Sequence, residues 1–142
     1  FILSVIKRAP YELIPFILSM FVIVSSLKSS GATEILKSFL DGFDEIFSYG
    51  ISSFLCSNLI NNIPMSVLFS TVTVSAKSTY ATIVGSNLGE IFTPVGALAG
   101  IMWSGLLKKN GIKFSFRDFI VYGATVSVPS LITCLAVLGL VL

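Results

Sequence analysis

The chain has 142 residues, of which 54% are hydrophobic and 11% are charged, with a formal net charge of +2. Soluble domains carry about 25% charged residues, so the low charge and the mean hydropathy of +0.95 argue against a soluble enzyme and predict an integral membrane protein. Histidine is absent and the two cysteines form no C-x-x-C motif, so no histidine-based metal centre, histidine base or zinc site is expected.

The first predicted transmembrane helix covers Pro10 to Leu27, where Glu12 is the only charge and Lys28 follows the end. Its length of about 18 residues is close to the ~20 that span a bilayer. Pro15 lies in the first turns, where proline is tolerated. The preceding residues, FILSVIKR, have the character of a helix already under way, so we interpret the chain as a later part of a longer polytopic protein.

Charged residues return between Ser29 and Glu45, where apolar residues recur at helical spacing. Thr33 is a candidate N-cap and Gly42 lies near the expected end of the helix. The pattern predicts a short amphipathic helix that lies at the membrane interface.

An uncharged run from Ile46 to Ala76 is longer than one straight span requires, and SNLINNIP, Ser57 to Pro64, interrupts it. The interruption leaves two apolar arms, Ile46 to Cys56 and Ile63 to Ala76. At 1.5 Å per residue each arm is about 17–21 Å long, which is half to two-thirds of the hydrocarbon core. The run therefore predicts a re-entrant helical hairpin.

A second interruption, SNLGEIFTP, lies in the next apolar run, whose only charge is Glu90. We expect the helix to break between Gly85 and Gly89, because glycine allows turns with positive φ. The break would leave a short arm, Tyr80 to Val84, and a long arm, Ile91 to Leu107. Together these arms predict one broken transmembrane helix.

The last predicted transmembrane helix is the uncharged run Phe119 to Leu142, with a potential kink at Pro129. The basic loop Lys108 to Arg117 precedes it, and Lys7 and Arg8 precede the first span. The positive-inside rule places both basic clusters in the cytoplasm and the acidic interfacial segment outside. Charge alone also allows the reverse layout, with the hairpin at the second interruption; the arm lengths favour the hairpin at the first.

The two interruptions supply the polar groups of a candidate site. Paired interrupted helices indicate a secondary transporter's site at the bilayer midplane, because non-helical backbone is tolerated there only where protein or a water-filled cavity covers it. We expect Asn62 to cap the helix that carries Pro64, and Thr93 or a neighbour to cap the helix that carries Pro94. The candidate substrate- or ion-binding residues are Ser57, Asn58, Asn61, Asn62, Gly85, Ser86, Asn87, Gly89 and Thr93.

A structural interpretation competes with the binding interpretation. Asparagine and serine in membrane helices also join neighbouring helices through hydrogen bonds, although the recurrence of Ser-Asn-Leu before a proline favours a site. Glu90 is a candidate proton or cation carrier, against the alternative of a solvated side chain at the edge of a water-filled cavity. The site suits a small polar solute or a partly dehydrated ion, because it lacks the paired basic residues expected for a multiply charged anion.

The stretch GSNLGEIFTPVGALAGIMWSGLLKKNGIKFSFRDF, Gly85 to Phe119, resembles the late part of arsenite permeases and related sodium/proton antiporters of the ion-transporter superfamily. The shared features are a G-x-N-x-G element, a T-P-x-G step, a small-residue helix with Trp103 and a basic loop. NNIP, Asn61 to Pro64, is similar to the tip of the family's preceding hairpin. The likeness extends from about Pro10 to the end of the chain.

The resemblance implies two inverted repeats, each with a re-entrant hairpin and a broken helix, of which this chain supplies the second. It also implies an elevator-like motion of a transport unit, residues 46–107, against a scaffold. Residues 1–45 would hold a scaffold helix and the interfacial helix, and residues 108–142 the basic loop and the last scaffold helix. The implied partners are the N-terminal half of the transporter, the lipid bilayer and arsenite, H⁺ or Na⁺; a homodimer stays open.

We therefore expect an all-α, multi-pass protein of the cell membrane that is not an enzyme and uses no cofactor and no nucleic acid. The expected function is arsenite efflux coupled to protons. The alternatives are a sodium/proton antiporter of the same architecture and, from another class, a membrane assembly subunit whose asparagines and serines only join helices. No G-x-x-x-x-G-K-[ST] motif supports ATP use by the chain itself; a separate ATPase partner stays open.

Overall fold

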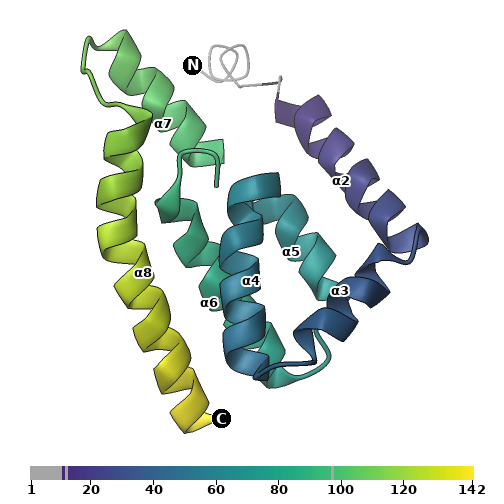
Figure 1. Cartoon of the computed structure of the whole chain (residues 1–142). Helices are drawn as coiled ribbons and strands as arrows, with labels where there is room; N and C mark the ends of the chain where they lie inside the picture. The colour runs from purple at the N-terminus through teal and green to yellow at the C-terminus, as the bar shows by residue number, and fades with distance from the viewer. Residues whose placement is uncertain (1–10, 12, 97) are drawn as a thin grey trace, which may run out of the picture.

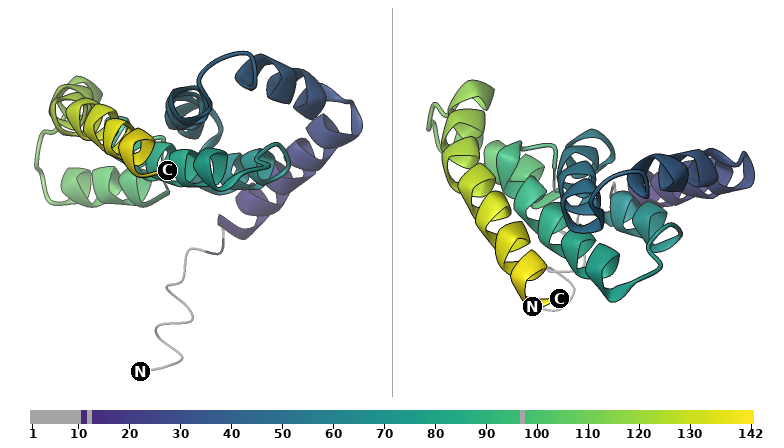
Figure 2. Two further views of the ribbon diagram at one scale, coloured as in Figure 1. Left: turned by 90° about the horizontal axis from the view of Figure 1, so that it is seen from below. Right: turned by 60° about the horizontal axis from the view of Figure 1, so that its bottom comes forward.

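The computed structural model describes residues 11, 13–96 and 98–142, and this part of the chain is all-helical, as expected (Figure 1). The described helices are α2 (Leu13–Ser29), α3 (Ala32–Leu40), α4 (Glu45–Ile60), α5 (Asn62–Ser70), α6 (Ala76–Phe92), α7 (Leu98–Lys109) and α8 (Phe116–Val141). Helices α4, α5 and α6 form the centre, with α2 and α3 on one side and α7 and α8 on the other (Figures 1 and 2).

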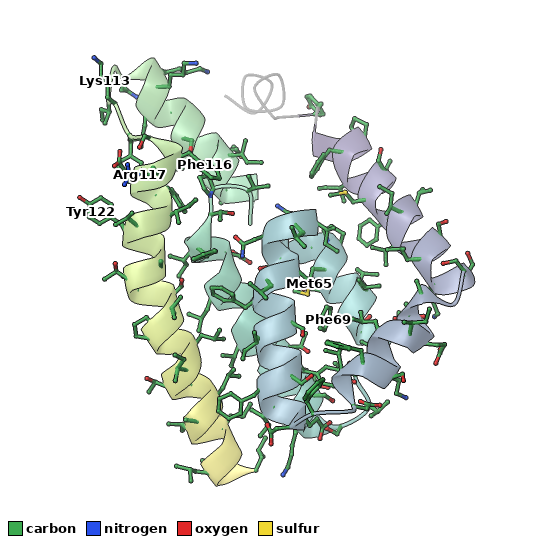
Figure 3. The ribbon with its side chains drawn as sticks, in the orientation of Figure 1. Met65, Phe69, Lys113, Phe116, Arg117 and Tyr122 are labelled. Carbon is green, nitrogen blue, oxygen red and sulfur yellow. The ribbon has the colours of Figure 1, made fainter. Side chains whose placement is uncertain are left out.

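The core lies among the three central helices. Helices α4 and α6 run in the same direction, whereas α5 runs back beside α4 and α8 runs back beside α6 (Figure 1). Met65 and Phe69 of α5 are fully buried in this core (Figure 3). Tyr49 of α4 is also fully buried, and its hydroxyl donates a hydrogen bond to the Val72 carbonyl oxygen at 3.2 Å. The core therefore holds the hairpin-like pair α4–α5 against α6.

Helices α4 and α6 approach each other so closely that their backbones touch. A Cβ atom on Gly85 would lie 2.1 Å from the Gly50 carbonyl oxygen and 2.2 Å from the Ser53 hydroxyl oxygen. A Cβ atom on Gly89 would lie 2.1 Å from the Ser57 hydroxyl oxygen. Such approaches depend on small residues, which are common where membrane helices pack together.

One helix in the described part of the chain, α8, is long and apolar enough to cross a bilayer by itself. Helices α2 and α3 pass the same test only as a pair that is bent by 77°. The expected first span corresponds to α2, in which Pro15 lies in the first turn as predicted; Pro10 and Glu12 fall outside the described residues. The expected interfacial helix corresponds to α3.

The predicted cap of α3 is wrong. Gly31, with φ of 77°, is the N-cap residue, and Thr33 lies inside the first turn and is buried. The chain turns sharply after α2, and this turn requires the left-handed conformation that glycine adopts without steric cost. Gly42 follows the C-cap residue Asp41, near the end of the helix as expected.

The first predicted interruption is too wide. Helix α4 continues through Ser57 and Asn58 to Ile60, and only Asn61 separates it from α5. The predicted arms, Ile46 to Cys56 and Ile63 to Ala76, therefore have the wrong ends. Both polar side chains fit into the helix because each donates a hydrogen bond to the Phe54 carbonyl oxygen at 2.8 Å.

The second interruption is predicted in the wrong place. Gly85 to Gly89 lie inside α6, without positive φ, and the helix ends at Phe92. The expected arms, Tyr80 to Val84 and Ile91 to Leu107, are replaced by a longer α6 and a shorter α7. The break begins at Thr93, which has an extended backbone, because a following proline disfavours the helical conformation.

The last helix begins three residues earlier than predicted. Ser115 and Asp118 form a reciprocal cap: the Ser115 hydroxyl oxygen accepts from the Asp118 N–H at 3.1 Å, and the Ser115 N–H donates to Asp118 Oδ2 at 3.0 Å. The predicted basic loop, Lys108 to Arg117, is too wide: Lys108 belongs to α7 and Arg117 to the first turn of α8, whereas Lys113 lies in the connection between them (Figure 3). The apolar helix itself is confirmed, since α8 extends to Val141 with Pro129 in its interior. The kink at Pro129 stays a prediction.

Replacing Gly85 with alanine should destabilise the protein by about 1–3 kcal/mol, because the added methyl group would overlap with the backbone of α4. The measurement is the midpoint of thermal unfolding of the purified protein in detergent. Gly105→Ala is the matched control, since a Cβ atom on that helical glycine meets nothing within 4 Å. Equal midpoints for the two variants would contradict the close packing of α4 and α6.

Candidate functional site

The two helix breaks lie against each other, and the backbone of one bonds to the backbone of the other. The Asn62 N–H donates a hydrogen bond to the Gly96 carbonyl oxygen at 3.1 Å. The Asn61 side-chain amide donates to the Val95 carbonyl oxygen at 3.3 Å, and the Gly96 N–H closes the second break by donating to the Thr93 carbonyl oxygen at 3.1 Å. Each break thus satisfies polar backbone groups of the other.

Side chains connect the breaks as well. The Asn62 amide donates a hydrogen bond to a carboxylate oxygen of Glu90, and the Thr93 hydroxyl donates to the Asn58 side-chain oxygen at 2.6 Å. All four of these side chains are half-buried. We refer to the residues that connect the two breaks as the break cluster: Asn58, Asn61, Asn62, Glu90, Thr93 and Gly96.

Asn61, and not Asn62 as predicted, caps α5. Its side-chain oxygen accepts a hydrogen bond from the Ile63 N–H at 3.4 Å, and its carbonyl oxygen accepts from the Met65 N–H at 3.1 Å. Its backbone has φ of 70° and ψ of 153°, and it is the only non-glycine with positive φ among the described residues. This combination lies outside the left-handed helical region that asparagine tolerates, in a region that is populated almost only by glycine, so the backbone at Asn61 is strained. Pro64 lies in the first turn of α5 as predicted.

The prediction that Thr93 or a neighbour caps a helix that carries Pro94 is also wrong, because Pro94 lies between α6 and α7. Thr93 is the C-cap residue of α6, and Pro94 is buried in the turn before α7 begins. Gly96 completes this turn in a confined space, because a Cβ atom there would lie 2.9 Å from the Gly89 carbonyl oxygen and 3.1 Å from Asn58 Oδ1. A side chain at this position would therefore separate the two breaks.

The break cluster offers hydrogen-bond acceptors more readily than donors. The first N–H groups of α5 are already paired, and Pro64 has none. Helices α4 and α6 both end at the cluster, and helix C-termini present carbonyl oxygens with partial negative charge. Glu90 is the charged group of the cluster. This chemistry suits a cation or a neutral solute that donates hydrogen bonds.

The other predicted site residues lie elsewhere. Ser57, Gly85 and Gly89 lie in the α4–α6 contact. Ser86 is buried, whereas Asn87 is exposed and donates to the carbonyl oxygen of its own helix at Ile83, at 2.7 Å. The sequence did not predict that the carbonyl groups of Val95 and Gly96 accept hydrogen bonds from the first break. The T-P-x-G step, which ends the helix before these residues, is the pattern that could have indicated it.

No metal centre is evident in the described residues, which contain no group of three or more acidic or cysteine side chains placed to hold an ion. Cys56 is half-buried and packs against the hydrophobic core, Cys134 is exposed, and both are free thiols.

Comparison with known proteins identifies relatives along nearly the whole chain. The family model named ArsB, arsenical pump membrane protein, matches residues 2–142. The arsenical pump membrane protein of Yersinia enterocolitica is 28% identical over 152 residues, covering 96% of this chain and 35% of the relative. The corresponding protein of Escherichia coli strain K12 is 27% identical, with the same coverage. The putative arsenical pump membrane protein of Bacillus subtilis strain 168 is 30% identical over 132 residues, covering 82% of this chain and 30% of the relative.

The chain spans about a third of the length of the curated relatives that it matches. No solved structure matches it.

Replacing Asn61 should separate the contribution of its backbone from that of its side chain. Asn61→Gly relieves the positive φ but loses the cap and the bond to Val95, whereas Asn61→Ala loses these bonds and keeps the strained backbone. We expect the alanine variant to be less stable than the glycine variant by about 1–2 kcal/mol. Thermal unfolding in detergent measures the difference, and an alanine variant as stable as the glycine variant would contradict the observed turn.

Proposed function

Because the chain belongs to the arsenical pump membrane protein family, we propose that it forms the C-terminal part of a secondary transporter that exports arsenite. The family and the apolar α8 place the chain in a multi-pass protein of the cell membrane. The rest of the transporter would supply an N-terminal half with a second, inverted repeat. The protein is then a transporter and not an enzyme.

The observation that carries the proposal is the direct bonding between the two helix breaks. Interrupted helices that meet in the interior of a membrane protein are the typical location of a transporter's binding site. Arsenous acid is uncharged at neutral pH and has three hydroxyl groups that donate hydrogen bonds. The break cluster presents the complementary groups, namely the Glu90 carboxylate, the Asn58 side-chain oxygen and the carbonyl groups at two helix ends.

Glu90 provides a route for proton coupling. As a carboxylate it accepts the hydrogen bond from the Asn62 side chain. Protonation removes the negative charge and weakens this charge-assisted bond, which would release Asn62 for a new partner. Proton binding at Glu90 and solute binding at Asn62 would thus influence each other.

The packing of α4 on α6 supports a motion of these helices as one unit. Their backbones touch at Gly50 and Gly85, so neither helix can slide past the other without steric overlap. Within an elevator-like mechanism, α4, α5 and α6 would therefore carry the break cluster together. The re-entrant hairpin would correspond to α4 and α5, joined at Asn61.

Sodium/proton antiport is the second candidate function. Glu90 favours it, because a carboxylate beside the carbonyl ends of two helices is also a suitable partner for Na⁺. The two candidates place the ion or solute at the same cluster and differ in what is exchanged for protons.

Transport assays on the full-length protein that contains this chain separate the candidates. In everted vesicles, Asn62→Ala and Glu90→Gln should each lower arsenite uptake about tenfold or more at sub-saturating arsenite. The reason is that a hydrogen bond to a charged group contributes about 1.5–3 kcal/mol, and 1.4 kcal/mol corresponds to a factor of ten. The amount of protein in the membrane is measured in parallel.

Asn110→Ala is the matched control, because this exposed asparagine, directly after α7, donates to the Leu106 carbonyl oxygen of that helix and lies outside the break cluster. Its uptake should equal that of the wild type. If the wild type takes up no arsenite but shows Na⁺-driven proton flux that Glu90→Gln abolishes, the antiporter is the correct assignment. Wild-type fluxes in every variant would instead contradict a binding role for the break cluster and indicate that its asparagines only join helices.

A further inference from the structure

A pocket lined mainly by aromatic side chains lies between α7 and α8, beside the end of α6. Its volume is about 220 Å³, which exceeds the ~150 Å³ of an apolar cavity that binds benzene. Its surface is almost entirely apolar, so it suits a hydrocarbon group and not a polar solute. The residues that line this aromatic pocket are Ile91, Trp103, Phe114, Phe119, Tyr122 and Gly123.

Contacts between aromatic rings fix the walls of the pocket. The Trp103 ring packs edge-on against the rings of Phe114 and Phe119, with centroids 5.3 and 5.8 Å apart. The Phe114 ring stacks on that of Tyr122, with centroids 6.2 Å apart. Edge-on and stacked arrangements at these separations are favourable for aromatic pairs. The side chains therefore support one another around the pocket and do not close it.

The pocket follows α8 from the membrane surface towards the interior of the bilayer. Phe114 precedes the helix, and Gly123 lies seven residues after the first helical residue, Phe116. At 1.5 Å per residue this distance is about 10 Å, within the ~15 Å of hydrocarbon in one leaflet. The inner end is closed by backbone, because a Cβ atom on Gly123 would lie 2.2 Å from the Ile91 carbonyl oxygen. An acyl chain that runs beside α8 would therefore enter the pocket and end against α6.

Basic side chains flank the outer end of the pocket. Lys113 directly precedes Phe114, and Arg117 lies in the first turn of α8 (Figure 3). Lys108 and Lys109 lie in the last turn of α7. All four basic residues are exposed. Their long side chains can cover apolar surface while the charged groups stay at the membrane surface.

The net charge at this end of the pocket is positive. From Lys108 to Asp118 the chain has four basic residues and one acidic residue, Asp118. The Asp118 carboxylate already accepts hydrogen bonds from the Ser115 N–H at 3.0 Å and from the Ser115 hydroxyl at 2.6 Å. Aromatic pockets can also bind cations, but the surrounding positive charge disfavours a cation here. The charge favours an anionic molecule with an apolar tail.

We propose that the aromatic pocket and the basic residues beside it form a binding site for an anionic phospholipid. One acyl chain lies in the pocket, and the phosphate group lies among the basic side chains. Clusters of basic residues at the membrane surface attract anionic lipids, and the positive-inside rule places this cluster at the cytoplasmic leaflet. The proposal rests on the membrane location of the family and not on the transported solute.

Quenching of Trp103 fluorescence tests whether a lipid occupies the pocket. In the full-length protein that contains this chain, the other tryptophans are replaced with phenylalanine, and the protein is placed in phosphatidylcholine bilayers. Phosphatidylglycerol or phosphatidylcholine with brominated acyl chains is then added in increasing amounts, because bromine quenches tryptophan only at short range. Brominated phosphatidylglycerol should reach half-maximal quenching at a mole fraction about tenfold or more lower, since each basic residue near an anionic lipid contributes about fivefold.

Removal of the basic side chains should abolish this preference. In Lys113→Gln/Arg117→Gln the two brominated lipids should quench to similar extents at each mole fraction. Lys28→Gln/Lys37→Gln is the matched control, because it removes the same charge from the last turns of α2 and α3, away from the pocket. Equal quenching by the two lipids in the wild type would overturn the proposal and indicate that bulk lipid or another segment of the transporter covers the pocket. A preference that persists without Lys113 and Arg117 would also overturn it.

Thermal unfolding in detergent tests whether the site requires the whole lipid. Added phosphatidylglycerol should raise the unfolding midpoint, because a ligand that binds the folded state stabilises it, whereas inorganic phosphate and phosphatidylcholine at the same concentration should not. Tyr122→Ala removes an exposed wall of the pocket and should lose most of this increase. Tyr80→Ala, at an exposed position of α6 outside the pocket, should keep it. An equal increase with inorganic phosphate, or a full increase in Tyr122→Ala, would overturn the lipid site.

Discussion

A helix that ends inside a membrane protein leaves backbone N–H and C=O groups without partners, and lipid cannot supply them. This chain interrupts two of its helices, and each break meets that requirement largely through the other. The Asn62 N–H donates a hydrogen bond to the Gly96 carbonyl oxygen, and the Asn61 side-chain amide donates one to the Val95 carbonyl oxygen. The polar side chains at Asn58 and Thr93 then pair across the same junction. The rest of the structure serves to keep these two breaks at one place.

The packing of α4 on α6 fixes that place. Ala81, Gly85 and Gly89 recur every four residues on α6, so one face of the helix has almost no side chains and meets the backbone of α4. Gly89 lies against Ser57, close to the point where α4 ends. Because both helices run in the same direction, their C-terminal ends reach the junction together (Figure 1). Small residues on one helix thereby determine where the polar groups of both breaks meet.

The sequence was sufficient to predict the membrane class, the presence of two interruptions and the last transmembrane helix, since these depend on hydropathy and on proline. It was insufficient for the limits of the breaks. Gly85 and Gly89 were interpreted as turn residues, but glycine also permits close helix contact, and only the position of the partner helix distinguishes the two roles. Asn58 did not end α4, because a side chain that bonds to its own helix needs no break. The grouping of Asn58, Asn61, Asn62, Glu90 and Thr93 follows from tertiary pairing, and local patterns do not contain it.

The pairing of the Asn62 side chain with Glu90 has a consequence for binding strength. A molecule that enters the cluster exchanges existing hydrogen bonds for new ones, so much of the gross interaction energy is offset by the bonds that it breaks. If the cluster is the proposed binding site, the net affinity would be modest and, for an ordinary association rate, the residence time short. For a carrier this is an advantage, because a tightly held molecule would limit the turnover of the whole cycle at the step of release. In the proposed transporter, the cluster would thus exchange its solute rapidly.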